Sequence, residues 1–512
     1  MLSGSSTDAL ADEIEVPEEV ASAALAEVVD RHDVGLDHAR SDAVAKRHAM
    51  GRRTARENVA DLVDADSFVE YGPLAIAAQR RRRDVAELIA RTPADGLVGG
   101  IGTIDGRRCV VASYDYMVLA GTQGMVNHRK KDRLFDLAQR LKLPVVFFTE
   151  GGGGRPGDVD MPGVSWLDCL AFALFGALGG SVPTIGVNAG YCFAGNAALL
   201  GTCDVVVATE DSNIGMAGPA MITGGGLGDF GPTEIGPADT HANNGVIDVL
   251  VADEAEATAV ARKVLGFSQH VSVAADAQPV ESLRRTVPEN RREVYDMHAV
   301  IDALVDLGSA VEFRSNWNPA MITTMARVVG RPLAIIANNP LHLAGAIDHG
   351  AAKKAAEFME LCEKWQLPIL FLCDTPGFMV GPDSDAEGLP RSAGKLFRVG
   401  ANLTVPFGTV ITRRGYGLGA QAMAGGGFKE PLFTVSWPTG EFGPMGLEGA
   451  VHLGFGRELS EASEGPERDA LFAKLLDTMI EHGKATNVAS HFEIDDAIDP
   501  ADTRRWIRLL FD

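Results

Sequence analysis

The chain has 512 residues, of which 46% are hydrophobic and 22% are charged, a composition typical of a globular protein with a large core. Its formal net charge of −23 excludes general nucleic-acid binding, because a phosphate backbone would be repelled. The six cysteines form no CxxC pair, which excludes a zinc ribbon. We therefore expect no metal, and reduced thiols of the kind found in the cytoplasm.

The first elements in chain order are weakly specified. Residues 1–35 are acidic and compatible with a helix, which predicts a peripheral helix or a tail. No basic start with an apolar core is visible, so we expect a cytoplasmic protein without a signal peptide. From Leu170 to Cys203 no residue is charged, but Gly179-Gly180 and Pro183 divide this stretch. It predicts a buried helix followed by a buried strand, without a membrane span.

Two basic runs stand out in this acidic chain, Arg80–Arg83 and His128–Lys131. Each could meet the phosphates of a phosphorylated cofactor, and each could equally be a solvated surface. The sequence leaves both interpretations open.

An internal repeat organises the chain. Gly106-Arg107 before an apolar run recurs as Gly330-Arg331, and Leu119-Ala120-Gly121 recurs as Leu343-Ala344-Gly345. Later motifs continue this order at an offset of 223 to 225 residues. The chain is therefore a tandem duplication, with a first domain over 36–275, a second over 290–512 and a joint near 270–295.

Each half alternates apolar strands with amphipathic helices. The strands 145–148 and 369–372 are continuously apolar, as expected where helices cover both faces of a sheet. The helix after His128 has a buried stripe that we predict to comprise Leu134, Leu137, Ala138 and Leu141. Residues 499–512 predict a short terminal helix with Trp506, Leu509 and Leu510 facing inward. This alternation indicates an α/β fold with largely parallel sheets.

Common catalytic motifs are absent or incomplete. The segment 388–395 resembles a P-loop, but five residues separate its glycines and Leu396 stands where Ser or Thr would bind magnesium. The segment 163–167 lacks the last glycine of a nucleophile elbow. The sequence therefore lacks the motifs that usually indicate a hydrolase, a kinase or a dehydrogenase.

Two glycine-bearing turns lie at equivalent points of the repeat. The runs 190–197 (GYCFAGNA) and 415–422 (GYGLGAQA) each follow an apolar strand and precede a helix of small residues. The unpaired N–H groups of a helix N-terminus carry partial positive charge and can hold a ligand oxygen. The pattern favours two oxyanion holes, and two close-packed junctions without chemistry are the alternative.

At these residues the chain resembles the carboxyltransferase β subunits of propionyl-CoA and methylcrotonyl-CoA carboxylases. The resemblance runs from about Ala45 to the C-terminus, and its markers occur in the family's order. They are GRRTARENVADLVDADSFVE, ADGLVGGIGTIDGRR, LAGTQG, TEGGGGRPG, NPAMITTMARVVGRPLAIIANNP, DTPGFMVGPDSDAEGLPRSAGK and SWPTGEFGPMGLEGAV.

The resemblance implies two crotonase-like domains and a hexamer, with the active site between the first domain of one subunit and the second of another. It also implies transfer of a carboxyl group from carboxybiotin to the α (or vinylogous) carbon of a coenzyme A thioester, through an enolate held by backbone N–H groups. No side-chain base is required.

The family pattern also places the site residues. The donor N–H groups fall at Ala194, Gly195, Leu418 and Gly419, and a register shift of one residue would move the second pair to Gly419-Ala420. Substrate contacts fall at Phe193, Gly417, Ala420 and Gln421, with Gln421 facing the acyl end; Leu418 is expected to narrow this pocket. The loop Gly152, Gly153, Gly154 and Arg155 falls on the biotin side, although TEGGGGRPG departs from the family's usual sequence there.

The resemblance implies partners as well. The chain has no Ala-Met-Lys-Met biotinylation site, so biotin is expected on a partner with biotin carboxylase and carrier domains. Two alternatives remain: a biotin-dependent decarboxylase or transcarboxylase subunit, and a non-catalytic scaffold of the carboxylase hexamer. The acyl-CoA itself is not specified.

Overall fold

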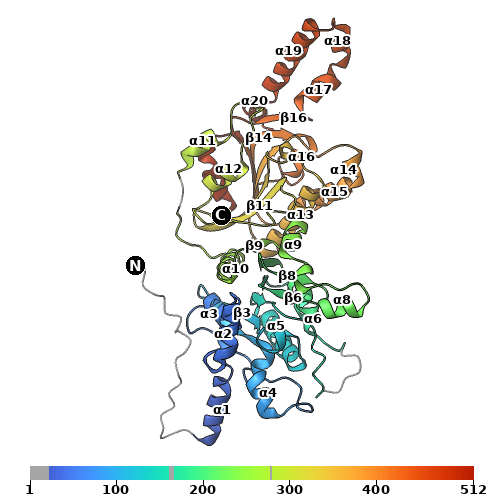
Figure 1. Cartoon of the computed structure of the whole chain (residues 1–512). Helices are drawn as coiled ribbons and strands as arrows, with labels where there is room; N and C mark the ends of the chain where they lie inside the picture. Colours follow the sequence, from blue (N-terminus) through green and yellow to red (C-terminus); the bar gives the residue numbers. More distant parts are fainter. Residues whose placement is uncertain (1–21, 161–166, 277–278, 512) are drawn as a thin grey trace. The chain divides into compact units, whose positions relative to one another are not determined.

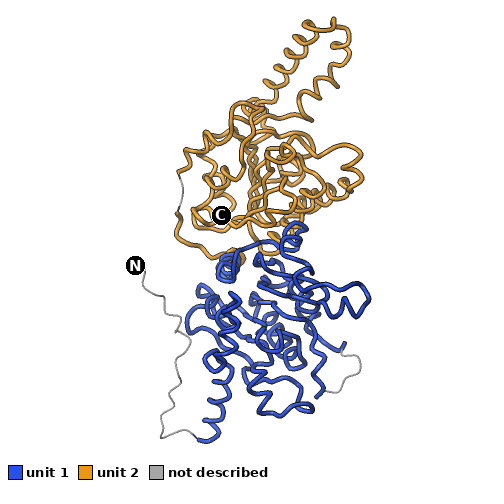
Figure 2. The backbone as a smooth tube through the Cα atoms, viewed as in Figure 1, with its two compact units in different colours: residues 1–266 blue, residues 267–512 orange. Residues whose placement is uncertain are grey.

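A computed structural model describes residues 22–160, 167–276 and 279–511. The chain divides into two compact units, Met1–Gly266 and Phe267–Asp512 (Figure 2). Residues 267–276 belong to the second unit, where the Val273 N–H donates to the Gly330 carbonyl at 3.1 Å. Of the expected N-terminal segment 1–35, residues 1–21 lie outside the described part, and the rest contains helix α1 (Ala23–Asp33).

The first unit is built on a seven-stranded sheet (Figure 1). Its first two pairings are antiparallel and the remaining four are parallel. The strands in spatial order are β1 (Val69–Glu70), β2 (Leu97–Ile104), β3 (Arg107–Tyr114), β4 (Val145–Phe148), β5 (Thr184–Asn188), β7 (Val205–Thr209) and β9 (Val249–Val251). Two short strands, β6 (Tyr191–Phe193) and β8 (Asn213–Gly215), form a separate parallel pair.

The second unit repeats this order. Its main sheet comprises β10 (Val311–Glu312), β11 (Met321–Val328), β12 (Arg331–Asn338), β13 (Ile369–Thr375), β14 (Phe407–Tyr416), β15 (Phe433–Ser436) and β17 (Asp496–Ala497). The strand β16 (Glu441–Gly443), which corresponds to β8, pairs with the end of β14. Left-handed backbone recurs too, with φ of 55° at Ala120 and 52° at Ala344. The tandem duplication and the α/β fold are confirmed.

Helices flank the sheets, and the longer ones bury an apolar face, as with Leu134, Phe135 and Ala138 in the helix after β3. In the first unit the main ones are α3 (Ala55–Leu62), α5 (Met125–Leu141), α6 (Ala171–Leu178), α7 (Gly195–Thr202) and α10 (Glu254–Ser268). In the second they are α12 (Met297–Leu304), α13 (His349–Trp365), α15 (Leu389–Gly400) and α16 (Gly417–Ala422). The four residues of β4 are all buried, as their apolar run predicts.

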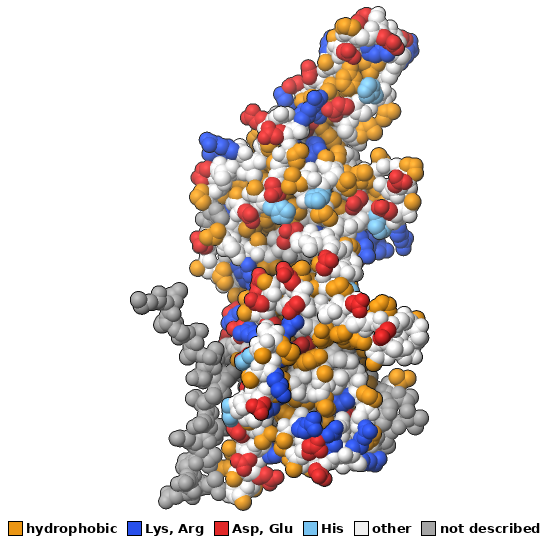
Figure 3. Space-filling view, in the orientation of Figure 1, with side chains coloured by type: hydrophobic (Ala, Val, Ile, Leu, Met, Phe, Trp, Pro, Cys, Tyr) orange, Lys and Arg blue, Asp and Glu red, His pale blue; other side chains and the backbone are white. Residues whose placement is uncertain are grey.

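Further helices lie after the main sheet strands and at the edges of the units. They are α2 (Ser41–Ala49), α4 (Val85–Arg91), α8 (Pro219–Gly224), α9 (Ala238–Asn244), α11 (Leu283–Thr286), α14 (Pro382–Ala386), α17 (Leu447–Gly454), α18 (Gly456–Glu461), α19 (Pro466–His482), α20 (Ala485–Ser490) and α21 (Thr503–Ile507). Acidic, basic and apolar side chains are interspersed on the face shown in Figure 3.

Two residues that we predicted to be buried are exposed. Leu141, at the last position of α5, is 44% exposed, while Leu134, Leu137 and Ala138 are buried. Leu509 is 49% exposed, because α21 ends at Ile507 and the following turn places Ile507 and Leu510 inward. The uncharged stretch forms the expected helix and buried strand, α6 and β5, although α6 is only partly buried, and it continues into β6, which was not predicted, and α7. In the described part of the chain no helix is long and apolar enough to cross a membrane.

Candidate active site

The first predicted turn joins β6 to α7. Ala194 has φ 52° and ψ −119°, and Gly195 begins the helix. The first i→i−4 bond runs from the Ala198 N–H to the Ala194 carbonyl at 2.9 Å, so the N–H groups of Gly195 and Asn196 lie before it. The Ala194 N–H donates to the Gly215 carbonyl at 2.8 Å and extends the β6–β8 ladder. The Ala194 N–H is therefore occupied within the chain, and the N–H groups of Gly195 and Asn196 are the candidate donors at this helix start.

The glycine-rich loop after β4 packs directly on this turn. The Gly151 N–H donates to the Tyr191 carbonyl at 2.7 Å, and the Gly152 N–H donates to the Ala120 carbonyl at 3.0 Å. Gly153 has φ 87°, and a β-carbon there would lie 2.8 Å from the β-carbon of Ala194. Only glycine fits at this position, because both the backbone conformation and the approach exclude a side chain.

A chain of buried polar groups fixes the loop and the helix together. The Asn196 Oδ1 accepts from the Gly153 N–H and from the Gln123 Nε2, each at 3.2 Å. The Lys131 ammonium donates to the Gln123 Oε1 at 3.0 Å and to the Tyr114 hydroxyl at 2.8 Å. Burial lowers the pKa of Lys131 to about 7. Sequence reasoning missed this network, although an amide within a run of small residues, as in Gly195-Asn196-Ala197, was a usable signal.

Arg155 does not present its guanidinium to a ligand. The side chain is 4% exposed and forms ion pairs with Asp95 and with Asp158, the latter at 3.6 Å. Its Nη2 also donates to the Thr122 carbonyl at 2.8 Å. These contacts hold the loop in place, so Arg155 contributes to the conformation of the loop that we predict to lie on the biotin side. Gly152 and Gly154 remain exposed on the loop.

Phe193 is a buried wall of the first turn. Its ring stacks on Tyr191 with centroids 5.8 Å apart and lies against Gly218. The Phe193 side chain thus packs within the first unit.

The second turn, at the end of β14, is built similarly. Gly417 has φ 56°, and α16 begins there. A β-carbon at Gly419 would lie 2.7 Å from the Gly377 Cα, so the loop after β13 touches this helix as the Gly153 loop touches α7. Ala420 is buried, whereas the Leu418 side chain is 62% exposed and does not line the cavity beside this turn.

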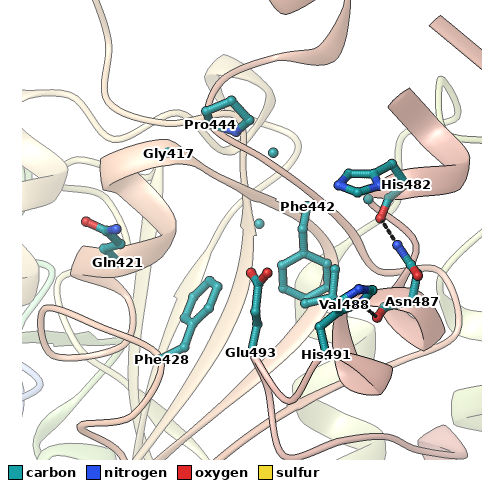
Figure 4. Close-up of a pocket in the computed structure, with 13 residues that line it drawn as sticks. Gly417, Gln421, Phe428, Phe442, Pro444, His482, Asn487, Val488, His491 and Glu493 are labelled. Carbon is teal, nitrogen blue, oxygen red and sulfur yellow. Dashed lines mark hydrogen bonds between the residues drawn. The ribbon is translucent and has the colours of Figure 1, made fainter. Parts of the chain in front are cut away.

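A cavity of about 320 Å³ opens beside the second turn (Figure 4). Gly417 and Gln421 of α16 form one wall, and Phe442, Val488 and Glu493 contribute to the others. The Gln421 carbonyl accepts the Ala424 and Gly426 N–H groups at 3.0 and 2.8 Å. Its side-chain amide has no hydrogen bond to any described residue and is exposed beside the cavity.

Equivalent carboxylates anchor both loops. Glu150 follows β4 and pairs with Arg47 through two hydrogen bonds. Asp374, in the matching place on β13, accepts from Arg414 Nε at 2.6 Å and pairs with Arg413 at 3.0 Å. Burial raises the pKa of Glu150 to about 7, and the Arg47 guanidinium opposes this rise. Neither carboxylate is free to act as a base.

The two basic runs differ in the structure. Lys130 and Lys131 are buried, and Lys130 donates to the backbone carbonyls of Ala94 and Leu97. Arg80–Arg83 are exposed, and Asp160 accepts from the Arg80 and Arg81 N–H groups at 2.7 and 2.9 Å. The lysines of the His128–Lys131 run are therefore structural, whereas Arg129 of that run and all four arginines of Arg80–Arg83 are exposed.

The doubled sheet, with a glycine-bearing helix start at the same point of each unit, defines a two-domain α/β fold of the crotonase type. A model of the carboxyl transferase domain matches residues 46–509. The chain belongs to the carboxyl transferase family and is an acyl-CoA carboxylase-type carboxyltransferase, as its motifs predict.

The similarity to known carboxylases and transcarboxylases extends over nearly the whole chain. It is 33% identical to the propionyl-CoA carboxylase beta chain of Saccharopolyspora erythraea, over 95% of this chain and 93% of that one. A single-chain, multi-domain long-chain acyl-CoA carboxylase has a TM-score of 0.90 and 53% identity, over 96% of this chain and 49% of that one. The transcarboxylase 12S hexamer, solved with methylmalonyl-CoA, has a TM-score of 0.82 and 29% identity, over 96% and 95%.

Proposed function

We propose that this chain transfers a carboxyl group from carboxybiotin, carried by a partner, to the α (or vinylogous) carbon of an acyl-CoA. The observation that carries the proposal is the pair of equivalent helix starts at Gly195 and Gly417, each closed by a glycine loop that admits no side chain. Such backbone donors suit a reaction in which oxygens, and not carbons, hold the developing negative charge.

The chain's own residues position the reactants and donate hydrogen bonds to them. Carboxybiotin, as the carboxyl donor, supplies carbon dioxide and the base that takes the α-proton. The N–H groups of Gly195 and Asn196 hold one oxygen that gains negative charge, and those of Leu418 and Gly419 hold the other. As the α-proton leaves, its bonding electrons move into the enolate, and the enolate carbon then forms the new carbon–carbon bond to carbon dioxide. The Gly153 and Gly377 loops keep both sets of donors aimed without reorganisation.

The partner and the assembly follow from the same relatives. A relative named biotin-dependent acetyl-/propionyl-coenzyme A carboxylase beta5 subunit supports a partner with biotin carboxylase and carrier domains, and the hexamer assembly of the transcarboxylase 12S structure supports a homohexamer here. The long-chain carboxylase, with higher identity than the 12S subunit, favours a carboxylase over a transcarboxylase. The intact donor turns count against a non-catalytic scaffold.

The test is a panel of acyl-CoAs assayed with bicarbonate, ATP and the cognate biotinylated partner. Carboxylation should require the partner and its biotin, and the chain alone should be inactive. Turnover without biotin would refute the mechanism. Transfer from methylmalonyl-CoA without ATP would assign the chain to the transcarboxylases.

A further inference from the structure

A buried lysine lies behind the first turn. Lys131, on α5, is fully buried, and its ammonium donates to two uncharged groups, the Tyr114 hydroxyl at 2.8 Å and the Gln123 Oε1 at 3.0 Å. Its Nζ also lies 5.3 Å from the centroid of the Tyr114 ring. A charge buried among neutral dipoles costs free energy that an apolar side chain would not. Core packing alone therefore does not account for a lysine at this position.

Two side-chain amides connect this ammonium to the glycine loop. An ammonium can only donate, so the Gln123 oxygen faces Lys131 and the Gln123 nitrogen faces the Asn196 Oδ1 at 3.2 Å. The same Asn196 oxygen accepts the Gly153 N–H, also at 3.2 Å. The Asn196 nitrogen is thereby directed to two backbone carbonyls. Donors and acceptors match at every contact in this arrangement, and the ammonium fixes its direction from one end.

The Gln123 amide lies against the donor that it would position. A β-carbon on Gly195 would lie 2.9 Å from the Gln123 Nε2, so this amide packs on the first residue of α7. The Gln123 backbone holds the loop as well, because its N–H donates to the Gly153 carbonyl at 2.7 Å and its carbonyl accepts the Arg155 N–H at 3.0 Å. Displacement of Gln123 would therefore move both the loop and the Gly195 N–H.

The second unit has apolar side chains where this chain of amides begins. The seventh residue of α5 is Lys131, whereas the seventh residue of α13 is Ala355. The bridge to the glycine loop is formed by Gln123 in the first unit and by Ile347 in the second. The second loop instead touches the Gly419 backbone directly. The two turns are therefore held by different means, and the buried charge belongs to the first.

We propose that Lys131 is a positioning residue for the first turn: its ammonium, acting through Gln123 and Asn196, holds the glycine loop against the Gly195 N–H. Hydrogen bonds in series polarise one another, so the ammonium also strengthens the bonds that the two amides donate. This inference rests on the proposed function, in which the Gly195 N–H meets developing negative charge. The loss of Lys131 should consequently slow the reaction without weakening the binding of the acyl-CoA.

Kinetics with the biotinylated partner test this role. Lys131→Met, which keeps the length of the side chain and removes its donors, should lower kcat at least tenfold and change the KM for the acyl-CoA less than threefold. Lys354→Met is the matched control, because it removes a buried ammonium that donates to the Arg314 carbonyl and not to a turn. Its kcat should fall less than threefold. Equal losses of kcat in the two variants would overturn the inference.

Variants of Gln123 test whether Lys131 acts through the amides. In Gln123→Glu the carboxylate still accepts from Lys131 but offers Asn196 no donor, so kcat should fall at least tenfold while the new ion pair maintains the fold. In a Gln123→Met background, Lys131→Met should lower kcat less than threefold further. A full second loss in the double variant would show that Lys131 acts independently of Gln123 and would overturn the inference.

Amide hydrogen exchange on the full chain provides a readout that needs no activity. Lys131→Met and Gln123→Glu should each accelerate exchange in the segment 149–155 at least tenfold, and Lys354→Met should leave it unchanged. Unchanged exchange in both folded variants of the first unit would overturn the inference. Accelerated exchange in a chain whose wild type carboxylates no thioester with its partner would refute the proposed function and leave the assignment of Lys131 standing.

Discussion

Gly153 and Ala194 touch so closely that a β-carbon on Gly153 would lie 2.8 Å from that of Ala194. Ala194 in turn is held by its N–H bond to Gly215, so it cannot retreat without breaking the β6–β8 ladder. The glycine loop after β4 and the start of α7 are therefore one rigid arrangement. Movement of either displaces the Gly195 N–H, which we propose as an oxyanion donor.

Gly153→Ala should consequently impair both folding and turnover. The residue has φ 87°, where a side chain costs about 1–3 kcal/mol, and the contact adds to this cost. We expect a lower unfolding midpoint in urea and a kcat reduced at least tenfold in the coupled carboxylase assay. Gly154→Ala is the matched control, because a β-carbon there meets nothing within 4 Å. Equal behaviour of the two variants would contradict the packing argument.

Removal of a donor N–H should affect the chemical step most. Gly195→Pro and Gly419→Pro each delete one N–H aimed at developing charge, and such a donor is typically worth about 2.7–4 kcal/mol, or roughly 10²–10³ in kcat. Gly195→Ala and Gly419→Ala keep the N–H and add the same β-carbon against Gln123 and Gly377. The difference within each pair measures the donor. If proline and alanine variants that fold and assemble turn over alike, the oxyanion assignment is wrong.

The Asn196 side chain should contribute substantially to the free energy of unfolding. Its side chain bonds the Gly153 N–H and the Gln123 amide, and it donates to the Gly121 and Thr149 carbonyls at 3.3 and 3.2 Å. Asn196→Ala leaves these buried groups unpaired, at a cost of about 1–3 kcal/mol in the free energy of unfolding. Asn243→Ala, on the exposed face of α9, should change it by less than about 0.5 kcal/mol. A comparable loss in both variants would show that the network is not special.

Sequence predicted the fold well because the signals were local and repeated. Continuous apolar runs and the 224-residue offset of Gly106-Arg107 from Gly330-Arg331 required no knowledge of tertiary contacts. The features that the sequence did not predict depend on distant partners. The Ala194 N–H is bonded to Gly215 of β8, and the Arg155 guanidinium is paired with Asp95 and Asp158, contacts that the local sequence does not reveal. The prediction that Leu141 is buried was wrong because Leu141 lies at the last position of its helix.

The pH dependence of stability should depend in part on His298. Its Nδ1 and Nε2 lie 2.8 and 3.1 Å from carboxylate oxygens of Asp296 and Glu312, an arrangement that only the doubly protonated ring satisfies. The hydrogen bond to Glu312 is the largest contribution raising the pKa of His298 to about 9. Because this folded-state value exceeds the unfolded one of about 6.5, the stabilisation is complete below pH 6.5 and is lost as pH rises through 9.

We therefore expect the difference in unfolding temperature between wild type and His298→Gln to be largest near pH 6 and to disappear above about pH 9.5. Differential scanning fluorimetry across this range measures it, and other histidines cancel in the difference. A difference that is constant with pH would mean that the side chain contributes packing and no charge.

Substrate choice should respond to Gln421, which lies on the cavity wall one helical turn after Gly417. Its carbonyl, and not its amide, bonds the residues that follow α16, so replacing the side chain leaves those bonds intact. An apolar contact discriminates one methylene by about 1–3 kcal/mol, which is roughly 10–200-fold in kcat/KM.

Gln421→Ile should favour longer acyl-CoAs over acetyl-CoA and propionyl-CoA, and Gln421→Asp should oppose them by placing a second carboxylate beside Glu493. In both variants kcat on the best substrate should fall far less than in Gly419→Pro. Gln139→Ile, at an exposed position of α5, controls for surface hydrophobicity. Unchanged ratios across the acyl-CoA panel, together with reduced stability, would assign Gln421 a purely structural role.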